Sequence, residues 1–224
     1  METTDASFNS KQVELATYTD FLGSLIAGSR SQCQNIVEKC MGAQLPIRVL
    51  YEQLFCRSLY DVGELWEFNK ISVATEHVAT AITEGLMNYL LPRIISQART
   101  KKKAVIASVE NELHQVGAKM VADVFEMHGW DSFYLGANTP TSELVRFVRE
   151  KSPDVVALSL SVYFNIGQLK KAIEILTHEL DGLPVLVGGQ AFRHGGESVV
   201  NKYSGVNYIS GLEDLESWIT GSAK

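Results

Sequence analysis

The stretch Ala104-Val105-Ile106-Ala107-Ser108-Val109, followed by Glu112-Leu113-His114-Gln115-Val116-Gly117, decides the fold of this chain. Its first half is a short apolar run, which is typical of a buried parallel strand. From Gly117 to His128 the apolar residues recur at helical spacing, so His114 lies on a turn between a strand and a helix. In an open parallel sheet this turn lies at the carboxyl end of the strand, where such folds bind ligands.

The second half of the chain repeats this alternation of short β-rich runs and amphipathic helices. It predicts a doubly wound, Rossmann-like domain over residues 101–224, built on a five-stranded parallel sheet. The predicted strands are Val105–Val109, Phe133–Leu135, Val155–Leu160, Val185–Val187 and Tyr208–Ile209.

The first half shows helical periodicity throughout, interrupted by Gly and Pro only at intervals. This pattern predicts a four-helix bundle over residues 1–100. The expected helices are Val13–Ile26, Ser31–Met41, Leu45–Phe68 and Ile71–Ile95. The cationic run Arg99-Thr100-Lys101-Lys102-Lys103 lies between the halves and is interpreted as a solvated linker.

Composition limits the possible functions. With 224 residues, 46% of them hydrophobic, the chain can bury a sizeable core. A net charge of −6 and a pI near 5.4 argue against nonspecific binding to nucleic acid, which requires positive charge. No signal peptide or membrane span is recognisable, so we expect a cytoplasmic protein. Cys33, Cys40 and Cys56 lack metal-site spacing and are expected to be reduced structural thiols.

His114 and Glu112 can act as a pair, because a carboxylate that accepts one ring N–H fixes the imidazole tautomer and makes the other nitrogen a better metal ligand. Further along the chain come Ser159-Leu160-Ser161 and then Gly188-Gly189. This succession of motifs resembles the cobalamin-binding domain of methionine synthase and its relatives. The pattern of that family is an acidic residue, x, His, x, x, Gly, then Ser-x-Leu or Ser-x-Thr, then Gly-Gly. The resemblance implies that cobalamin binds here, with His114 as the lower axial ligand of cobalt.

The same resemblance gives roles to the other motif residues. Gly117, Gly188 and Gly189 would leave room for the displaced nucleotide tail of the cofactor, since a residue without Cβ permits close approach. Ser159 would offer its hydroxyl to the displaced base. The chain departs from the family pattern at two positions: Glu112 stands where many relatives have Asp, and Ser161 stands where Leu or Thr is usual.

A second cluster lies in the helical half. Val73, Glu76 and His77 are spaced i, i+3 and i+4, so they share one helix face, and Trp66 enters from the preceding turn. Taken by itself, the cluster has a structural interpretation, in which Trp66 and Val73 belong to the bundle core and Glu76 and His77 form a local polar contact.

The pattern Trp-x9-Glu-His resembles the signature of light-sensing cobalamin regulators of the CarH type. The resemblance implies that Trp66, Val73, Glu76 and His77 surround the adenosyl group above cobalt. In that family a histidine follows the tryptophan, whereas this chain has Glu67, which leaves His77 as the nearest alternative ligand. The family also carries an N-terminal helix-turn-helix domain; fewer than about 15 residues precede the bundle here, so we expect no operator binding of that kind.

These observations favour a binding protein over an enzyme. The expected function is a stand-alone adenosylcobalamin-dependent sensor of light or cofactor status, which signals through movement of the helical cap, through homo-oligomer assembly or through a protein partner. The alternative is a corrinoid carrier that shuttles methyl groups between methyltransferases and binds methylcobalamin. A storage or delivery protein is a third possibility. A radical mutase would need a substrate barrel for which the chain has no room.

Overall fold

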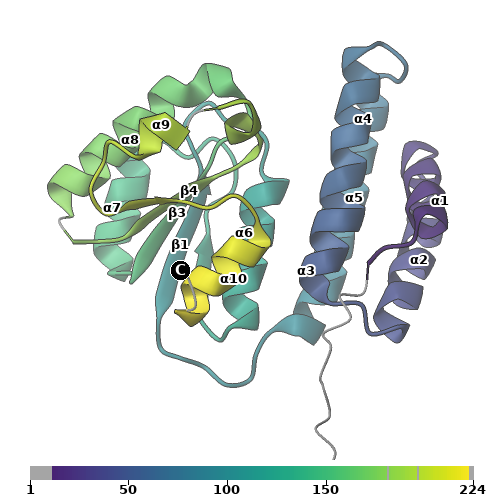
Figure 1. Ribbon diagram of the computed structural model, residues 1–224, viewed down its shortest axis with the longest axis horizontal. Coiled ribbons are helices and arrows are strands. Elements are labelled where there is room, and N and C mark those ends of the chain that lie inside the picture. The colour runs from purple at the N-terminus through teal and green to yellow at the C-terminus, as the bar shows by residue number, and fades with distance from the viewer. Residues whose placement is uncertain (1–11, 181, 196, 222–224) are drawn as a thin grey trace, which may run out of the picture. The chain divides into compact units, whose positions relative to one another are not determined.

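The computed structural model describes residues 12–180, 182–195 and 197–221. The chain divides into two compact units between Tyr89 and Leu90, which we call the helical unit and the sheet unit. Composition predicts a domain boundary near residue 100 instead, and that boundary stays a prediction. Figure 1 shows the elements of both units. None of the described helices combines the length and apolarity that crossing a bilayer requires.

The helical unit follows the predicted periodicity closely. Its elements are α1 (Leu15–Ile26), α2 (Arg30–Gly42), α3 (Ile47–Val49), the π-helix η1 (Leu50–Cys56), α4 (Arg57–Glu67) and α5 (Val73–Ile94), which extends past Tyr89. The helix expected over Leu45–Phe68 is therefore a succession of α3, η1 and α4. Phe55 packs between Phe21 and Tyr51, with ring centroids 5.7 and 5.6 Å apart, and all three are fully buried. Cys33, Cys40 and Cys56 are free cysteines, and the first two are buried.

The sheet unit is a doubly wound α/β fold. Its strands are β1 (Lys103–Ser108), β2 (Asp131–Tyr134), β3 (Val155–Ser159), β4 (Val185–Gly188) and β5 (Val206–Tyr208). All neighbouring strands pair in parallel, in the order β2-β1-β3-β4-β5. The helices between them are α6 (Val116–Met127), α7 (Thr141–Lys151), α8 (Ile166–Glu179), α9 (Glu197–Val200) and α10 (Leu212–Thr220), with the short helices η2 (Tyr163–Asn165) and η3 (Gln190–His194).

The central strands are buried on both faces, as their apolar sequences predict. Helices α7 and α8 cover one face, while α6 and α10 lie on the other (Figure 1). Val105 and Leu158 belong to the core under α7 and α8, together with Leu144 and Ile173. The predicted five-stranded parallel fold is thus confirmed.

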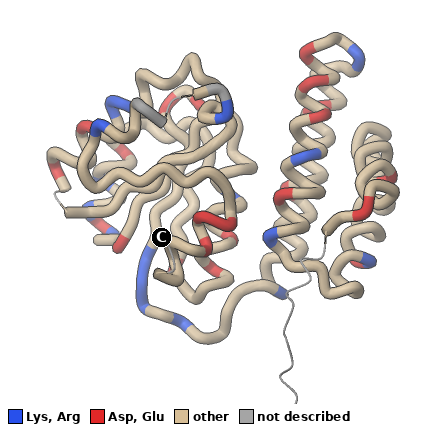
Figure 2. Tube along the Cα trace, viewed as in Figure 1, with Lys and Arg blue, Asp and Glu red and all other residues tan. Residues whose placement is uncertain are grey.

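Residues 99–102 are exposed and lie outside the helices and strands, as expected of a solvated linker, but hydrogen bonds attach them to the sheet unit. The run carries the positive charges that Figure 2 marks on the segment entering β1. Arg99 forms ion pairs with Glu126 and Asp131, and Lys103 is the first residue of the sheet. The Arg99 charge is held on the sheet unit because carboxylates at the end of α6 and the start of β2 accept its hydrogen bonds.

Candidate functional site

The strand order reverses between β1 and β3, since the chain proceeds from β1 to one edge and then back across it. Such a switch point at the carboxyl ends of parallel strands is where doubly wound folds bind ligands. Ser108 of β1 pairs with Ser159 of β3, which in turn pairs with Gly188 of β4. Two of the predicted site residues, Ser159 and Gly188, are therefore adjacent in the sheet, and the loop carrying His114 follows β1, the first strand of this row.

His114 and Glu112 form the predicted pair. Nδ1 of His114 donates to Oε1 of Glu112 over 2.6 Å, and the backbone N–H of His114 donates to the same oxygen over 3.0 Å. The carboxylate is fully buried, whereas the imidazole side chain is 61% exposed. The arrangement fixes the ring through Nδ1 and makes Nε2 the nitrogen that would bind a metal.

The second oxygen of Glu112 ties this loop to the one after β3. Oε2 accepts the backbone N–H groups of Ser161 and Val162 over 2.9 and 2.8 Å. Burial by itself would raise the pKa of Glu112, but the hydrogen bonds from the His114 ring and from three backbone N–H groups outweigh it and hold the pKa at about 2. Glu112 is therefore ionised at neutral pH, and Ser161 takes part through its backbone.

Ser159 and Gly117 are neighbours, as the motif predicts. A Cβ added at Gly117 would lie 3.9 Å from Oγ of Ser159, which is an ordinary contact distance. Ser159 is buried at the end of β3. The start of α6 therefore lies beside the last residue of β3, and both have small side chains at this point.

The double glycine has a reason within the fold itself. A Cβ on Gly188 would lie 2.8 Å from the carbonyl oxygen of Ile209, and one on Gly189 would lie 2.2 Å from that of Leu160. Gly189 also adopts φ +118°, a conformation that is almost confined to glycine. Close packing of backbone on backbone thus requires both glycines, whatever ligand binds beside them.

Exposed apolar side chains lie on the two loops that Glu112 joins, and the motifs did not predict them. One of them directly precedes His114, and the others directly follow Ser161. Phe164 is the most exposed, at 93%. Large exposed apolar clusters commonly mark binding surfaces. The members of this cluster, which we call the apolar rim, are Leu113, Val162, Tyr163 and Phe164. The run Val162-Tyr163-Phe164 directly after a polar turn was the available signal in the sequence.

Three asparagines fix the loops that carry the site. Asn111 donates its backbone N–H to the side chain of Asn138 over 2.8 Å, and the Asn165 amide donates to the carbonyl of Asn111 over 3.0 Å. Asn138 in turn donates its N–H to the carbonyl of Glu112 over 2.8 Å. Asn111 and Asn138 have φ of 67° and 49°, left-handed conformations that asparagine tolerates better than most residues. The loops after β1, β2 and β3 are thereby joined around His114.

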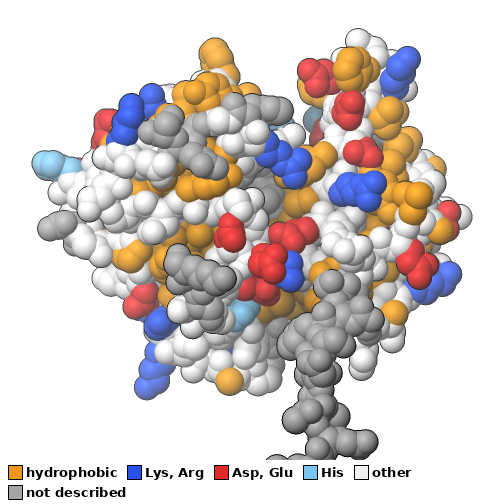
Figure 3. Space-filling view, viewed as in Figure 1, with side chains coloured by type: hydrophobic (Ala, Val, Ile, Leu, Met, Phe, Trp, Pro, Cys, Tyr) orange, Lys and Arg blue, Asp and Glu red, His pale blue; other side chains and the backbone are white. Residues whose placement is uncertain are grey.

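In the helical unit, the cluster predicted around Trp66 lies at the surface. Trp66 near the end of α4 is 49% exposed and Val73 at the start of α5 is 48% exposed, so neither is a core residue. Other hydrophobic side chains are interspersed with charged ones along α4 (Figure 3). The exposure of Trp66 and Val73 contradicts the bundle-core interpretation of these two residues.

Glu76 and His77 make the local polar contact that the sequence left open. Nδ1 of His77 donates to Oε2 of Glu76 over 2.6 Å, and the Thr80 hydroxyl donates to Oε1 over 3.0 Å. The His77 side chain is 74% exposed. This pair has the same composition and the same 2.6 Å separation as His114 and Glu112, but its carboxylate is 25% exposed.

Comparison with known proteins identifies the ligand class. A model of the B12 binding domain matches residues 102–214, and a second model with the same description matches residues 18–91. The HTH-type transcriptional repressor CarH of Myxococcus xanthus is 26% identical over 196 residues, which are 87% of this chain and 64% of the repressor. Methionine synthase of Mycobacterium tuberculosis is 22% identical over 75% of this chain but only 14% of that enzyme.

Corrinoid proteins of Methanosarcina species are similar over much of their own length. Dimethylamine corrinoid protein 1 of Methanosarcina acetivorans is 24% identical over 76% of this chain and 81% of that protein. The monomethylamine corrinoid protein of Methanosarcina barkeri has the same fold, with a TM-score of 0.78 over 92% of this chain and 98% of that structure at 13% identity.

The site geometry agrees with these matches. An exposed imidazole whose Nδ1 is held by a buried, ionised carboxylate fits the chemistry of a cobalt ligand. The apolar rim beside it suits a large macrocycle, because burying apolar surface stabilises binding. Both units match B12 binding domain models, and the match to the sheet unit covers half of the chain. The chain belongs to the B12 binding domain family and is a cobalamin-binding protein.

Proposed function

We propose that this protein is an adenosylcobalamin-dependent sensor of light or cofactor status, without catalytic activity of its own. Its output would be a displacement of the helical unit that changes its assembly or the state of a protein partner. The observation that carries the proposal is the exposed cluster of Trp66, Val73 and the Glu76–His77 pair. The similarity to the CarH repressor supports it.

On the lower side of the cofactor, His114 would bind cobalt and Glu112 would hold the imidazole. Gly117, Ser159 and Ser161 would lie along the nucleotide tail, with Ser159 hydrogen-bonded to the displaced base. Gly188 and Gly189 would border the same tail, in addition to their role in backbone packing.

On the upper side, the residues of the helical unit would recognise the adenosyl group. Trp66 offers an indole face for stacking, and Val73 adds apolar surface. Glu76 has two acceptor oxygens for ribose hydroxyls or the adenine amine, provided that Thr80 or His77 releases one of them. Adenosylcobalamin itself supplies a cobalt–carbon bond that visible light breaks. Loss of the adenosyl group would remove its contacts with Trp66 and Glu76 and so bias the position of the helical unit.

The direct test is a spectrum. Protein reconstituted with adenosylcobalamin in darkness should change its visible absorbance under green light, and size-exclusion chromatography should show a different oligomeric size or partner complex after illumination. If absorbance, size and partner binding all stay the same, the sensor proposal is wrong.

Affinity measurements separate this proposal from the alternative, a corrinoid carrier of methyl groups. The alternative is favoured by the similarity to dimethylamine corrinoid protein 1 along most of its length. Trp66→Ala should weaken binding of adenosylcobalamin roughly tenfold while leaving methylcobalamin nearly unchanged, because only the first carries a nucleoside to stack. Leu15→Ala, which alters an exposed apolar residue of α1, is the matched control. Equal loss for both cofactors would favour the carrier.

A further inference from the structure

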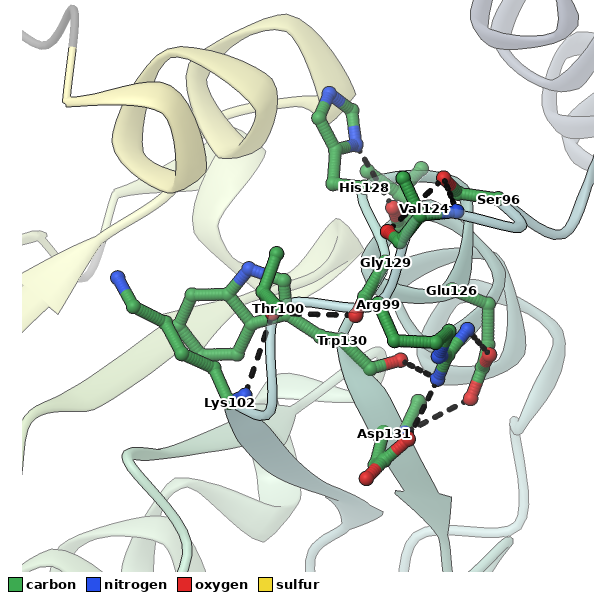
Figure 4. A network of polar contacts seen from close by, with 12 residues as sticks. Ser96, Arg99, Thr100, Lys102, Val124, Glu126, His128, Gly129, Trp130 and Asp131 are labelled. Atoms are coloured by element: carbon green, nitrogen blue, oxygen red, sulfur yellow. Dashed lines mark hydrogen bonds and ion pairs between the residues drawn. The ribbon is translucent and has the colours of Figure 1, made fainter.

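Residues 96–102 connect α5 to β1, and the structure attaches them to the sheet unit at many points (Figure 4). We call this segment the strap. The guanidinium of Arg99 donates to the carboxylate of Glu126 over 2.8 Å and to that of Asp131 over 2.7 Å. It also donates to the carbonyl oxygen of Trp130. The three acceptors come from the end of α6 and the start of β2, so one side chain of the strap binds the whole α6–β2 turn.

The backbone of the strap makes a second set of bonds to the same turn. The Ser96 N–H donates to the carbonyl of Glu126 over 3.1 Å. The Thr100 N–H donates to the carbonyl of Gly129 over 2.8 Å, and the Thr100 hydroxyl donates to the same oxygen over 3.1 Å. At the end of the strap, the Asp131 N–H donates to the carbonyl of Lys102 over 2.8 Å, which continues into the pairing of β1 with β2.

The α6–β2 turn is shaped to receive the strap. Gly129 has φ +78°, and a Cβ at this position would lie 2.1 Å from the carbonyl oxygen of Ala98. Any other residue would therefore push the strap away. Beside it, the Lys102 ammonium lies 5.0 Å from the centroid of the Trp130 ring, within the range of a cation–π contact. The strap therefore packs against the α6–β2 turn as closely as the parts of a folded domain pack against one another.

The free length of chain between the strap and α5 is short. Helix α5 ends at Ile94, and the Ile95 N–H still bonds to the carbonyl of Leu91 over 3.2 Å. The next residue, Ser96, is already bonded to Glu126. Pro92 lies within α5, where it removes one helical hydrogen bond and commonly bends the helix.

From this geometry we infer that the strap is a fixed part of the sheet unit and that any hinge between the two units lies before Ser96. Arg99 strengthens this attachment, because its guanidinium donates to three acceptors of the α6–β2 turn. For the proposed sensor, the attachment would restrict the paths open to the helical unit; the inference about the strap itself does not depend on that function.

Hydrogen exchange of the cobalamin-free protein tests the inference without any variant. The amides of Ser96 and Thr100 should exchange on the order of 100-fold more slowly than in an unstructured peptide, because each is bonded to the α6–β2 turn. Exchange of both amides at the unstructured rate would overturn the inference.

Limited proteolysis with trypsin tests the role of Arg99. Cleavage after Lys101 and Lys102 should be about tenfold faster in Arg99→Gln than in the wild type, because cleavage follows the population of the open strap. Arg146→Gln, which removes an exposed ion pair with Glu143 in α7, is the matched control and should not change this rate. Gly129→Ala should act like Arg99→Gln, since its methyl group would displace Ala98.

The outcomes are distinct. If the wild type is cleaved within the strap as fast as Arg99→Gln, the strap is not fixed and the inference fails. If Arg99→Gln unfolds, the inference is still tested by the exchange rates of the Ser96 and Thr100 amides in the wild type and by the rate at which trypsin cleaves Gly129→Ala. A failure of the light response would leave all three measurements unaffected, so the strap and the proposed function can fail separately.

Discussion

At the scale of single residues, the site depends on a carboxylate that is buried yet ionised. Glu112 accepts four hydrogen bonds, two from His114 and two from the backbone of Ser161 and Val162. These donors stabilise the negative charge because hydrogen bonds to a fully buried carboxylate are stronger than hydrogen bonds in water. The same charge orients the imidazole, so folding and cofactor binding both use this side chain.

Glu112→Gln should lower both the stability of the fold and the affinity for cobalamin. Its amide would present N–H groups to at least one of the present donors, so we expect a loss of about 2–4 kcal/mol in the free energy of unfolding. We also expect 10- to 100-fold weaker cobalamin binding, which is typical when the partner of a ligating histidine is altered. Urea unfolding and equilibrium dialysis measure the two effects. Glu143→Gln, at an exposed ion pair of α7, serves as the control, and equal behaviour of both variants would contradict the role of Glu112.

The pH dependence of stability follows from the same residue. Because the folded pKa of Glu112 is about 2 against an ordinary value of 4.5, its contribution is present above pH 4.5 and is lost as pH falls towards 2. The lowering corresponds to about 3 kcal/mol. The difference in unfolding free energy between the wild type and Glu112→Gln should therefore shrink as the pH falls below 4.5. A difference that persists unchanged at pH 3 would count against this assignment.

Gly189 makes a separate prediction about backbone packing. Gly189→Ala should destabilise the protein by more than about 3 kcal/mol, since it combines a conformation almost confined to glycine with a clash against Leu160. Gly182→Ala is the matched control, because Gly182 also has positive φ but has open space around it. We expect it to cost about 1 kcal/mol. Similar unfolding midpoints in urea for the two variants would show that the close approach at Gly189 is unimportant.

At the scale of elements, hydrophobic periodicity predicts the fold because the main cores lie within regular elements. The expected strand at Val155–Leu160 is observed as Val155–Ser159, and the expected helix at Ile71–Ile95 as Val73–Ile94. The π-helix η1 was not predicted, since its apolar residues have nearly the same spacing as those of an α-helix. The predicted start of β5 was two residues too late, because a strand of three residues shows little hydrophobic pattern.

The site was predictable where its contacts are local in sequence and unpredictable where they are not. Glu112 and His114 are two residues apart, so their hydrogen bond follows from the motif. The bonds from Ser161 and Val162 join residues about 50 apart through backbone N–H groups, which leave no trace in side-chain identity. For the same reason the exposed position of Phe164 depends on the fold, although its apolar character is visible in the sequence.

The apolar rim belongs to this scale, because Leu113 lies on the loop after β1 and its other members lie on the loop and short helix that follow β3. The double variant Tyr163→Ala, Phe164→Ala should change the unfolding free energy by less than about 0.5 kcal/mol, as both side chains are exposed. Cobalamin affinity should fall roughly tenfold if the corrin covers these rings. Leu15→Ala is again the control for removing an exposed apolar group. Unchanged affinity would show that the rim serves some purpose other than cofactor binding.

At the scale of the whole molecule, composition and contacts give different answers about where the sheet unit begins. The change in sequence character lies near residue 100, because the helical pattern stops there and the β-rich pattern begins. The contacts divide the chain between Tyr89 and Leu90. The strap accounts for part of this difference, since its residues have the composition of a linker and the hydrogen bonds of a folded segment. The sequence shows that Arg99 is charged, but it does not show that Glu126 and Asp131 lie close enough to accept its hydrogen bonds.

Two fragments of the chain can decide how far the sheet unit extends. A fragment of residues 95–224 keeps the strap, whereas one of residues 102–224, which starts where the B12 binding domain match begins, lacks Arg99 and Thr100. The longer fragment should be more stable by about 1–3 kcal/mol, allowing for the partial exposure of the ion pairs. Introducing Arg99→Gln into the longer fragment should remove much of that difference, because the guanidinium joins the strap to three acceptors. Equal urea midpoints for the two fragments would place the start of the independently stable unit at β1, and the strap would then contribute nothing to it.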